Sequence, residues 1–350
     1  MDSEQFSQAV LRWFRNYGRH DLPWQKTATP YRVWVSEIML QQTQVVTVIP
    51  YFERFMKRFP TLKTLALANI DEILAHWSGL GYYARARNLH RTAQIIHEKY
   101  LDQFPTTIED LKALPGIGQS TAGAILSLGM HQYSVILDGN IKRVLARYHV
   151  LSTPINQSDG ISLLWGLAKK YTPQNDFWNY NQAMMDIGAM ICTFTKPKCP
   201  LCPLKKTCSA NQQTRQIEFP VKKLKKNRLC KSTYLILLQN AEGRILLEKR
   251  PPVGVWGGLW SFPECPIEAN IETWCRTRFD IDDIKLERWN SFSHKFSHFK
   301  LEIKPILLQV RLKVPKIVEG EPQIWYKMDS PLPGGVSAPV AQLLKRLKKL

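Results

Sequence analysis

The sequence is short of acidic residues. Its 350 residues include 29 Asp and Glu against 48 Lys and Arg, which gives a formal net charge of +19. An excess of positive charge of this size favours a polyanionic partner, such as nucleic acid or an anionic membrane surface. The alternative is a basic protein whose lysines are only solvated.

Long apolar runs are lacking as well. No stretch reaches the length that spans a bilayer, and residues 1–20 carry early acids and no signal-peptide core. The seven cysteines are an odd number, which argues against a disulfide framework. We therefore expect a monomer in a reducing cytoplasm, associated with the nucleoid if bacterial, with no membrane partner.

Two periodicities divide the chain. Residues 1 to about 211 have apolar positions every three or four residues, which predicts a mostly helical domain. A basic stretch then predicts a linker over 212–229. Residues 230–350 predict a separate α+β domain. The first apolar stripe is expected to pack in the core, and it consists of Phe6, Val10, Trp13 and Tyr17. The expected strands of the second domain are 232–239, 244–250, 298–312 and 322–328, and its expected helices are 267–279 and 338–349.

Four cysteines form the densest motif. Cys192, Cys199, Cys202 and Cys208 follow one another as C-x6-C-x2-C-x5-C, among several lysines. Four thiolates this close can hold one metal centre. Structural zinc usually pairs two C-x2-C knuckles and only one occurs here, whereas a 4Fe–4S cluster tolerates uneven spacing. Zinc and plain buried thiols stay open as alternatives.

Residues 111–124, LKALPGIGQSTAGA, predict a turn followed by a helix. Gly116 and Gly118 let the backbone approach a ligand closely, and a helix that begins near Ser120 points free N–H groups toward an anion. A phosphate held in this way fixes position without reading sequence. An ordinary connection between two helices is the alternative.

Two acids lie in suggestive places. Asp138 precedes a helix-forming run that starts at Gly139-Asn140, where its simplest role is an N-cap. Glu37 is the one acid of residues 33–46, VWVSEIMLQQTQVV, which predict an amphipathic helix. A solvated glutamate is the simplest interpretation there, but an acid among apolar neighbours holds its proton longer, as a general acid must.

Together these motifs resemble the endonuclease III superfamily of DNA glycosylases. Within it, the sequence is similar to the MutY-type adenine DNA glycosylases in LPWQ (22–25), VWVSEIMLQQTQV (33–45), GLGYYARARNL (79–89), LPGIG (114–118) and the cysteine spacing. The resemblance implies an all-α helix–hairpin–helix glycosylase domain with a 4Fe–4S cluster loop over 1–211, and a Nudix (MutT)-like α+β domain over 230–350. It implies duplex DNA with adenine opposite 8-oxoguanine or guanine as the substrate.

The resemblance also implies roles for residues. Glycosylases that cut the DNA backbone usually carry a lysine just after the hairpin, where this chain has Gln119-Ser120, so we expect base removal that leaves an abasic site. Glu37 would protonate the flipped adenine on N7, and Asp138 would stabilise the sugar cation by charge or by a transient bond. Asn140 and Ser120 would support these two acids.

Further positions follow from the same resemblance. Gln42 and Tyr82 are expected to enter the duplex near the unpaired base, although Tyr82 could also be a packed loop residue. The residues expected to line the adenine pocket are Arg19, Leu22, Trp24 and Gln182. The candidates for phosphate neutralisation are Arg85, Arg87, Lys142 and Arg143.

In the second domain, GVWGGLWSFPE (254–264) resembles the entry to a Nudix fold. The segment that follows has too few acids, at the wrong spacing, to hold magnesium, so we expect the fold without pyrophosphatase chemistry. In the family this domain recognises 8-oxoguanine, and the matching loop is HKFSHFKL (294–301). Its candidate residues are Phe296, Ser297 and His298, and a plain connection into the next strand is the alternative.

Three other functions are weighed against this one. An endonuclease III-like glycosylase and lyase for oxidised pyrimidines is disfavoured by Ser120 and by the Nudix-like domain. In a non-catalytic iron–sulfur DNA-binding protein, Asp138 would only cap a helix and Glu37 would only be solvated. A working Nudix hydrolase would turn over nucleoside triphosphates with magnesium.

Overall fold

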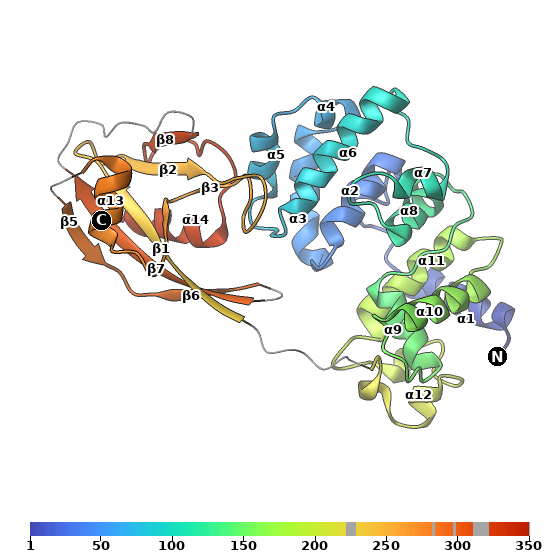
Figure 1. Cartoon of the computed structure of the whole chain (residues 1–350). Helices are drawn as coiled ribbons and strands as arrows, with labels where there is room; N and C mark the ends of the chain where they lie inside the picture. The colour runs from blue at the N-terminus through green and yellow to red at the C-terminus, as the bar shows by residue number, and fades with distance from the viewer. Residues whose placement is uncertain (222–228, 282–283, 297–298, 311–321, 350) are drawn as a thin grey trace. The chain divides into compact units, whose positions relative to one another are not determined.

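The computed structural model describes residues 1–221, 229–281, 284–296, 299–310 and 322–349 (Figure 1). The chain divides into two compact units, residues 1–67 with 88–225 and residues 68–87 with 226–350. Part of the stretch interpreted as a linker is folded into the first unit, where Phe219 is buried. Residues 222–228 of that stretch lie outside the described residues.

Helices build the first 221 residues, and local signals set where several of them begin. A capping box of Asp2 and Gln5 starts the first helix, and Thr29 with Pro30 starts the second. No described helix is both long and apolar enough to cross a membrane. The α-helices are α1 (Ser3–Tyr17), α2 (Pro30–Leu40), α3 (Val45–Arg58), α4 (Leu62–Ala66), α5 (Ile70–Trp77), α6 (Ala84–Tyr100), α7 (Ile108–Lys112), α8 (Gln119–Ala124), α9 (Gly139–Tyr148), α10 (Ser158–Tyr171), α11 (Phe177–Asp186) and α12 (Ser209–Gln212).

The apolar stripes of these helices form the core of the first unit. Phe6, Val10 and Trp13 of α1 are buried as predicted, and they pack with residues of α9, α10 and α11. The prediction was wrong for Tyr17, which is 68% exposed at the end of α1, next to the Gly18 C-cap.

The helix predicted over 33–46 is in fact two helices. Helix α2 ends at Leu40, and α3 begins at Val45. Between them Gln42 adopts a left-handed backbone conformation, with φ 58°. No Gly or Pro marks the break, but the four polar residues 41–44, QQTQ, interrupt the apolar spacing there, and the prediction passed over this signal.

One twisted sheet organises the second unit, and its described strands follow the order β3-β2-β1-β7-β5, with β8 beside β2, β4 beside β1 and β6 beside β7. Strands β1 and β7 are parallel, with Leu229 opposite Phe299 and Gln239 opposite Gln309, and the other pairs are antiparallel. The strands are β1 (Leu229–Gln239), β2 (Ile245–Lys249), β3 (Trp260–Ser261), β4 (Glu264–Cys265), β5 (Ile284–Arg288), β6 (Phe292–Lys295), β7 (Phe299–Val310) and β8 (Gln323–Tyr326).

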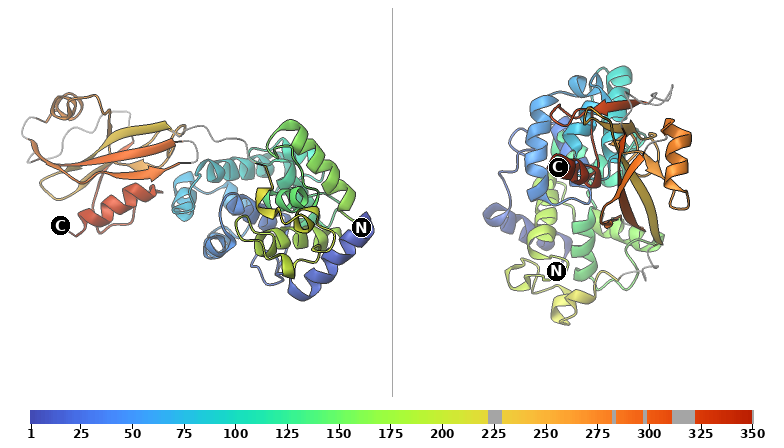
Figure 2. Two further views of the ribbon diagram at one scale, coloured as in Figure 1. Left: turned by 90° about the horizontal axis from the view of Figure 1, so that it is seen from below. Right: turned by 90° about the vertical axis from the view of Figure 1, so that its left-hand side faces the viewer.

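Two helices cover the opposite faces of this sheet. Alternate residues of β1 point to opposite sides, so Leu235 and Leu237 pack with α14 (Ala338–Leu347), while Ile236 and Leu238 pack with α13 (Ile271–Phe279) (Figure 2). Helix α13 begins four residues later than the sequence pattern predicts, because Asn270 caps it.

Residues 68–87 belong to the second unit through specific contacts. Asp71 of α5 forms an ion pair of 2.7 Å with Lys249 on β2. The hydroxyls of Ser78 and Tyr83 both donate to the carbonyl of Val336, at 3.1 and 3.0 Å. These contacts join a helical segment to a sheet domain from which it is distant in the sequence.

Candidate active site

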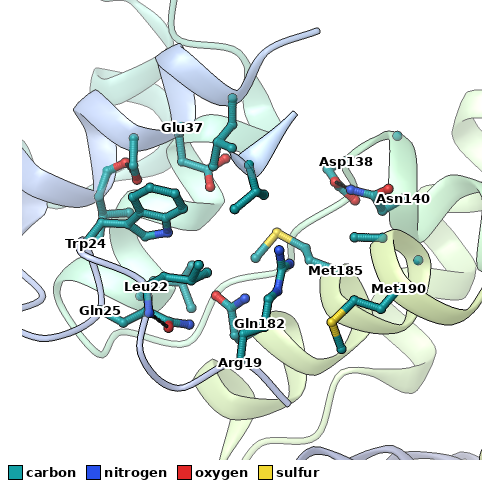
Figure 3. Close-up of a pocket in the computed structure, with 18 of the residues that line it drawn as sticks. Arg19, Leu22, Trp24, Gln25, Glu37, Asp138, Asn140, Gln182, Met185 and Met190 are labelled. Atoms are coloured by element: carbon teal, nitrogen blue, oxygen red, sulfur yellow. Dashed lines mark hydrogen bonds between the residues drawn. The ribbon is translucent and has the colours of Figure 1, made fainter. Parts of the chain in front are cut away.

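A cavity of about 1220 Å³ opens in the first unit (Figure 3). Helix α2, the loop that follows α1, the start of α9 and helix α11 supply side chains to its walls. The structure thereby brings together residues that the sequence interpretation assigned to catalysis and base binding. Those that line it are Arg19, Leu22, Trp24, Glu37, Gln42, Ser120, Asp138, Asn140 and Gln182.

Glu37 projects from α2 into this cavity (Figure 3). Its helix neighbours Val33, Ser36 and Ile38 are buried. Burial disfavours the charged carboxylate, and the nearby charge of Asp138 adds to that effect, so the pKa of Glu37 rises from 4.5 to about 8. At neutral pH this side chain is therefore mostly a neutral acid that can donate a proton.

Asp138 combines an N-cap with a position in the cavity. Its Oδ1 accepts the Ile141 N–H at 2.7 Å at the start of α9, and its Oδ2 accepts Asn140 Nδ2 at 2.8 Å. Burial raises the pKa of Asp138, while these hydrogen bonds and the charge of Arg143 act in the opposite direction. Asp138 thus has hydrogen-bond donors and a cation that stabilise its anionic form. No hydrogen bond or cation of the described residues lowers the pKa of Glu37 in this way.

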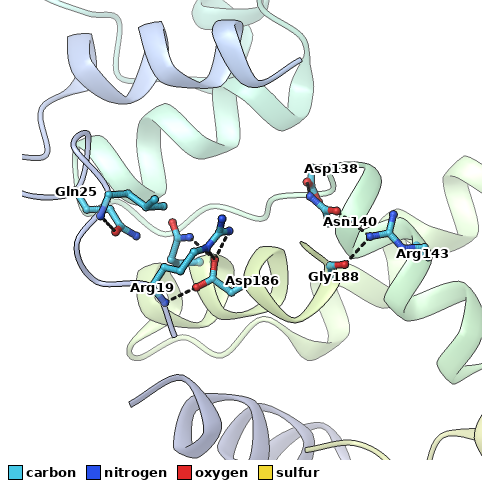
Figure 4. A network of polar contacts seen from close by, with 9 residues as sticks. Arg19, Gln25, Asp138, Asn140, Arg143, Asp186 and Gly188 are labelled. Carbon is cyan, nitrogen blue, oxygen red and sulfur yellow. Dashed lines mark hydrogen bonds and ion pairs between the residues drawn. The ribbon is translucent and has the colours of Figure 1, made fainter. Parts of the chain in front are cut away.

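Arg143 connects Asn140 to the segment that leads into the cysteine loop (Figure 4). Its Nη2 donates to Asn140 Oδ1 at 2.8 Å and to the carbonyl of Gly188 at 2.6 Å. Its Nε donates to the carbonyl of Cys192 at 2.7 Å. This arginine therefore fixes the side chain that in turn holds Asp138.

A second arginine organises the cysteine loop. Arg147 is only 2% exposed, and its guanidinium donates to the carbonyls of Thr193, Phe194 and Phe219 at 2.7 to 2.9 Å. It also lies 3.3 Å from Cys192 Sγ. A planar donor with several N–H groups suits such a set of acceptors, which a lysine could not satisfy.

The four cysteines of the predicted metal motif line one small cavity of about 30 Å³. Burial raises the pKa of the Cys202 thiol to about 12, so a thiolate there requires positive charge nearby. No three Cys, His, Asp or Glu side chains in the described part of the chain converge on the position of a single metal ion. Four thiols around one space are a donor set that can hold a metal centre.

The sequence interpretation missed Asp186, which ends α11. Its side chain is fully buried and forms an ion pair with Arg19, with Nη2 and Oδ1 2.6 Å apart (Figure 4). Gln182 donates to the same Oδ1 at 2.9 Å. Helical spacing places Gln182 and Asp186, four residues apart, on one face of α11, but it gives no sign of the partner Arg19.

Other predicted residues lie outside the large cavity. Gly116 has φ 79° in the hairpin, and Gly118 is the residue before α8. Tyr82 belongs to the second unit, is 47% exposed and has φ 50°. Phe296 stacks on Phe299 with ring centroids 4.4 Å apart. Ser297 and His298 lie outside the described residues.

Three of the four predicted phosphate contacts are engaged within the protein. Arg85 donates to the carbonyls of Leu80 and Gly81, and Arg87 donates to the carbonyl of Gly257. Arg143 holds Asn140 as described above. A role in phosphate binding therefore stays a prediction for all four.

Two family models match the chain. The HhH-GPD superfamily base excision DNA repair protein model matches residues 35–169, and the NUDIX domain model matches residues 233–346. The adenine DNA glycosylase of Buchnera aphidicola subsp. Baizongia pistaciae (strain Bp) is 43% identical over 344 residues, covering 98% of this chain and 97% of that protein. The adenine DNA glycosylase of Rattus norvegicus is 32% identical over 376 residues, covering 90% of this chain and 72% of that protein.

Solved structures with the same fold cover the helical part. A thermostable thymine-DNA glycosylase has a TM-score of 0.55 and 27% identity, over 60% of this chain and 97% of its own. A non-covalent endonuclease III–DNA complex has a TM-score of 0.52 and 19% identity, over 61% of this chain and 98% of its own. The fold, the paired carboxyls and the identity along almost the whole sequence agree with one another. The chain belongs to the MutY-type adenine DNA glycosylases of the endonuclease III superfamily, which remove adenine from DNA by hydrolysis of the N-glycosidic bond in base excision repair.

Proposed function

We propose that this glycosylase acts on adenine opposite 8-oxoguanine or guanine in duplex DNA, with Glu37 as the proton donor and Asp138 as the anion beside the sugar. The observation that carries the mechanism is the difference between the two carboxyl groups of one cavity. Burial raises the pKa of both carboxyls, to about 8 for Glu37, but only Asp138 has the hydrogen bonds of Ile141 and Asn140 and the charge of Arg143 acting to lower its pKa. One acid and one carboxylate are what a two-carboxyl glycosidic cleavage requires.

The reaction begins when the target adenine leaves the base stack and enters the cavity. Glu37 donates its proton to N7, which makes the base a better leaving group. The bond between C1′ and N9 breaks, and positive charge develops on the sugar, where Asp138 stabilises it by charge or by a transient bond. Glu37, now deprotonated, takes a proton from the attacking water, which adds to C1′. The products are free adenine and an abasic site.

Ser120 supports a reaction that stops at the abasic site. It lines the cavity where related bifunctional enzymes are expected to place a lysine, and its hydroxyl cannot form an imine with C1′. Asn140 acts through Asp138 by its 2.8 Å hydrogen bond. Gln42 and Tyr82 are proposed to enter the duplex, and the left-handed backbone of each holds it in a turn between helices.

We also propose that Cys192, Cys199, Cys202 and Cys208 hold a 4Fe–4S cluster, as expected for this superfamily. The supporting observation is the shared cavity lined by the four thiols. When bound, the cluster would supply positive charge to the thiolates and tie the cysteine loop together. The lysines of that loop and the net charge of +19 suit a DNA backbone.

The second unit is proposed to read 8-oxoguanine on the opposite strand, without Nudix hydrolysis. Trp256, His294, Phe296 and Phe299 form an aromatic cluster at β6 and β7, with centroid separations of 4.4 to 5.5 Å. Flat rings of this kind can contact an exposed base. Helix α13 carries one acid, Glu272, which is too few to hold magnesium.

The proposed substrate is tested with labelled duplexes that place adenine opposite 8-oxoguanine, guanine or thymine, and with a duplex that contains thymine glycol. We expect adenine release from the first two, with strand cleavage only after alkali treatment. Cleavage of the thymine glycol duplex without alkali, and no adenine release, would support the glycosylase and lyase alternative instead.

The cluster is tested by metal and sulfide analysis of the purified protein. We expect a brown protein that contains iron and inorganic sulfide in equal amounts. The Cys202→Ser variant should lose the iron and the sulfide. Cys230→Ser is the matched control, because Cys230 is exposed on β1 in the second unit. Zinc without sulfide would contradict the proposal.

Gly188 provides a test of the support beneath Asp138. A Cβ on Gly188 would lie 2.4 Å from Asn140 Cβ, so Gly188→Ala must displace Asn140. Because a small misplacement of catalytic groups is costly, we expect single-turnover adenine release to fall roughly tenfold or more. Gly166→Ala is the control, since it places a Cβ in open space on α10 and favours a helix. Equal rates in the two variants would show that the position of Asn140 is unimportant.

A further inference from the structure

We propose that Asp186 is a positioning residue that makes the cavity selective for 6-aminopurines, because it fixes the amide of Gln182 with the oxygen toward the base. This inference rests on the proposed function, since it concerns how the same cavity distinguishes adenine from other purines.

Asp186 is a buried hub of hydrogen bonds. Its Oδ1 accepts Arg19 Nη2 at 2.6 Å, Arg19 Nε at 2.9 Å and Gln182 Nε2 at 2.9 Å. Its Oδ2 accepts the backbone N–H of Arg19 at 2.7 Å. The Asp186 side chain has no exposed surface, so solvent offers no alternative partner for these oxygens. Rearranging this set would leave a buried charge without its donors, which is costly.

The carboxylate decides which way the Gln182 amide faces. An ionised carboxylate only accepts hydrogen bonds, so the amide atom that meets Asp186 must be the NH₂ group. The oxygen then faces away from Asp186. Gln182 lines the cavity and is 8% exposed, and Figure 3 shows its side chain beside Arg19, both directed toward the space that Glu37 and Asp138 also face.

The resulting surface has a definite hydrogen-bond pattern. Gln182 offers an acceptor, and Arg19 beside it offers the N–H groups of Nη1, which Asp186 does not use. The Watson–Crick edge of adenine carries the complementary pair, an amino donor at N6 next to an acceptor at N1. Hypoxanthine has an oxygen at C6 and an N–H at N1. Its oxygen would therefore face the oxygen of Gln182, and its N–H would face the N–H groups of Arg19.

A free glutamine side chain could rotate its amide and accept either base. Asp186 prevents this rotation, because the rotated amide would point its oxygen at a buried carboxylate. A site whose polar groups are fixed in this way rejects a ligand that lacks the matching groups far more strongly than a flexible one. Selectivity thus comes from a residue that need not touch the base.

Asp186→Asn tests this arrangement, since asparagine can both donate to and accept from the Gln182 amide. Single-turnover release of adenine and of hypoxanthine, each opposite 8-oxoguanine, is measured in the variant and in the wild-type protein. We expect the adenine-to-hypoxanthine rate ratio to fall about tenfold or more. Comparing ratios removes the intrinsic difference in lability between the two glycosidic bonds. Asp159→Asn, which makes the same change at an exposed residue of α10, should leave the ratio unchanged.

Gln182→Leu provides a second test if Asp186→Asn does not fold. It keeps the Arg19–Asp186 pair and removes the acceptor, so adenine release should fall more than hypoxanthine release. A wild-type ratio in a folded Asp186→Asn or Gln182→Leu protein would overturn the inference. Absence of adenine release by the wild-type protein would instead overturn the proposed function.

Discussion

Glu37→Gln is expected to abolish most adenine release while DNA binding is retained. Glutamine has nearly the same shape but no proton to donate at N7 and no carboxylate to activate water. A positioned acid or base contributes roughly 10²- to 10⁴-fold to the rate. The measurement is single-turnover adenine release from the 8-oxoguanine mispair, with the dissociation constant for the same duplex determined in parallel.

The wild-type pH profile follows from the pKa of Glu37, which is about 8 instead of 4.5. The protonated acid prevails below pH 8, so adenine release should fall as the pH rises through about 8. The free energy of unfolding should also fall as the pH rises. Between pH 4.5 and 8 Glu37 is ionised in the unfolded chain but protonated in the folded one, so each rise in pH favours the unfolded state. Glu37→Gln should remove that loss.

Glu53→Gln is the matched control for this prediction, because Glu53 is exposed on α3. It should change neither the rate nor the pH profile. Wild-type adenine release by Glu37→Gln would refute the assignment of the proton donor and would favour a role for Glu37 in structure alone.

Asp138→Asn is expected to have an effect of similar size for a different reason. Asparagine caps helices about as well as aspartate, so α9 should keep its first turn. The negative charge beside the sugar is lost, and adenine release should fall by roughly 10²- to 10⁴-fold, the scale of one positioned catalytic group.

The same variant also tests whether the two acids act on each other. The charge of Asp138 contributes to the raised pKa of Glu37, so its removal should move the midpoint of the residual pH profile below 8. The control is Asp2→Asn, an N-cap of the same type at the exposed start of α1. A variant that releases adenine at the wild-type rate would mean that Asp138 is only a helix cap.

The sequence alone marked the two acids only as candidates, and their catalytic roles came from the family resemblance and stay predictions. Glu37 is the one acid in an apolar stretch, where a carboxyl is expected to hold its proton longer. The N-cap role of Asp138 was weighed against a catalytic one, and the structure shows the cap together with a place in the cavity. A short polar side chain can do both, since only Oδ1 is needed for the cap.

Other parts of the site depend on contacts that local spacing does not show. Asp186 meets Arg19 across 167 positions of the chain, and nothing near either residue in the sequence indicates the pair. Strands β5 and β6 were missed for a similar reason. Their sequences, IKLER and FSHK, are charged and short, and pairing with the long strand β7 makes them strands.

The placement of residues 68–87 matters for anyone who wishes to divide this protein. A truncation after Cys208, the last cysteine of the cysteine loop, would keep Asp71, Ser78 and Tyr83 but remove Lys249 and Val336, to which they bond. The loop that carries Tyr82 would then lose the hydrogen bonds of Ser78 and Tyr83, which lie before and after Tyr82 in the sequence. Reduced activity of such a fragment would report a disturbed loop as well as the loss of the contacts with 8-oxoguanine that we propose for the second unit, and the two losses would have to be separated by substitutions in the full-length chain.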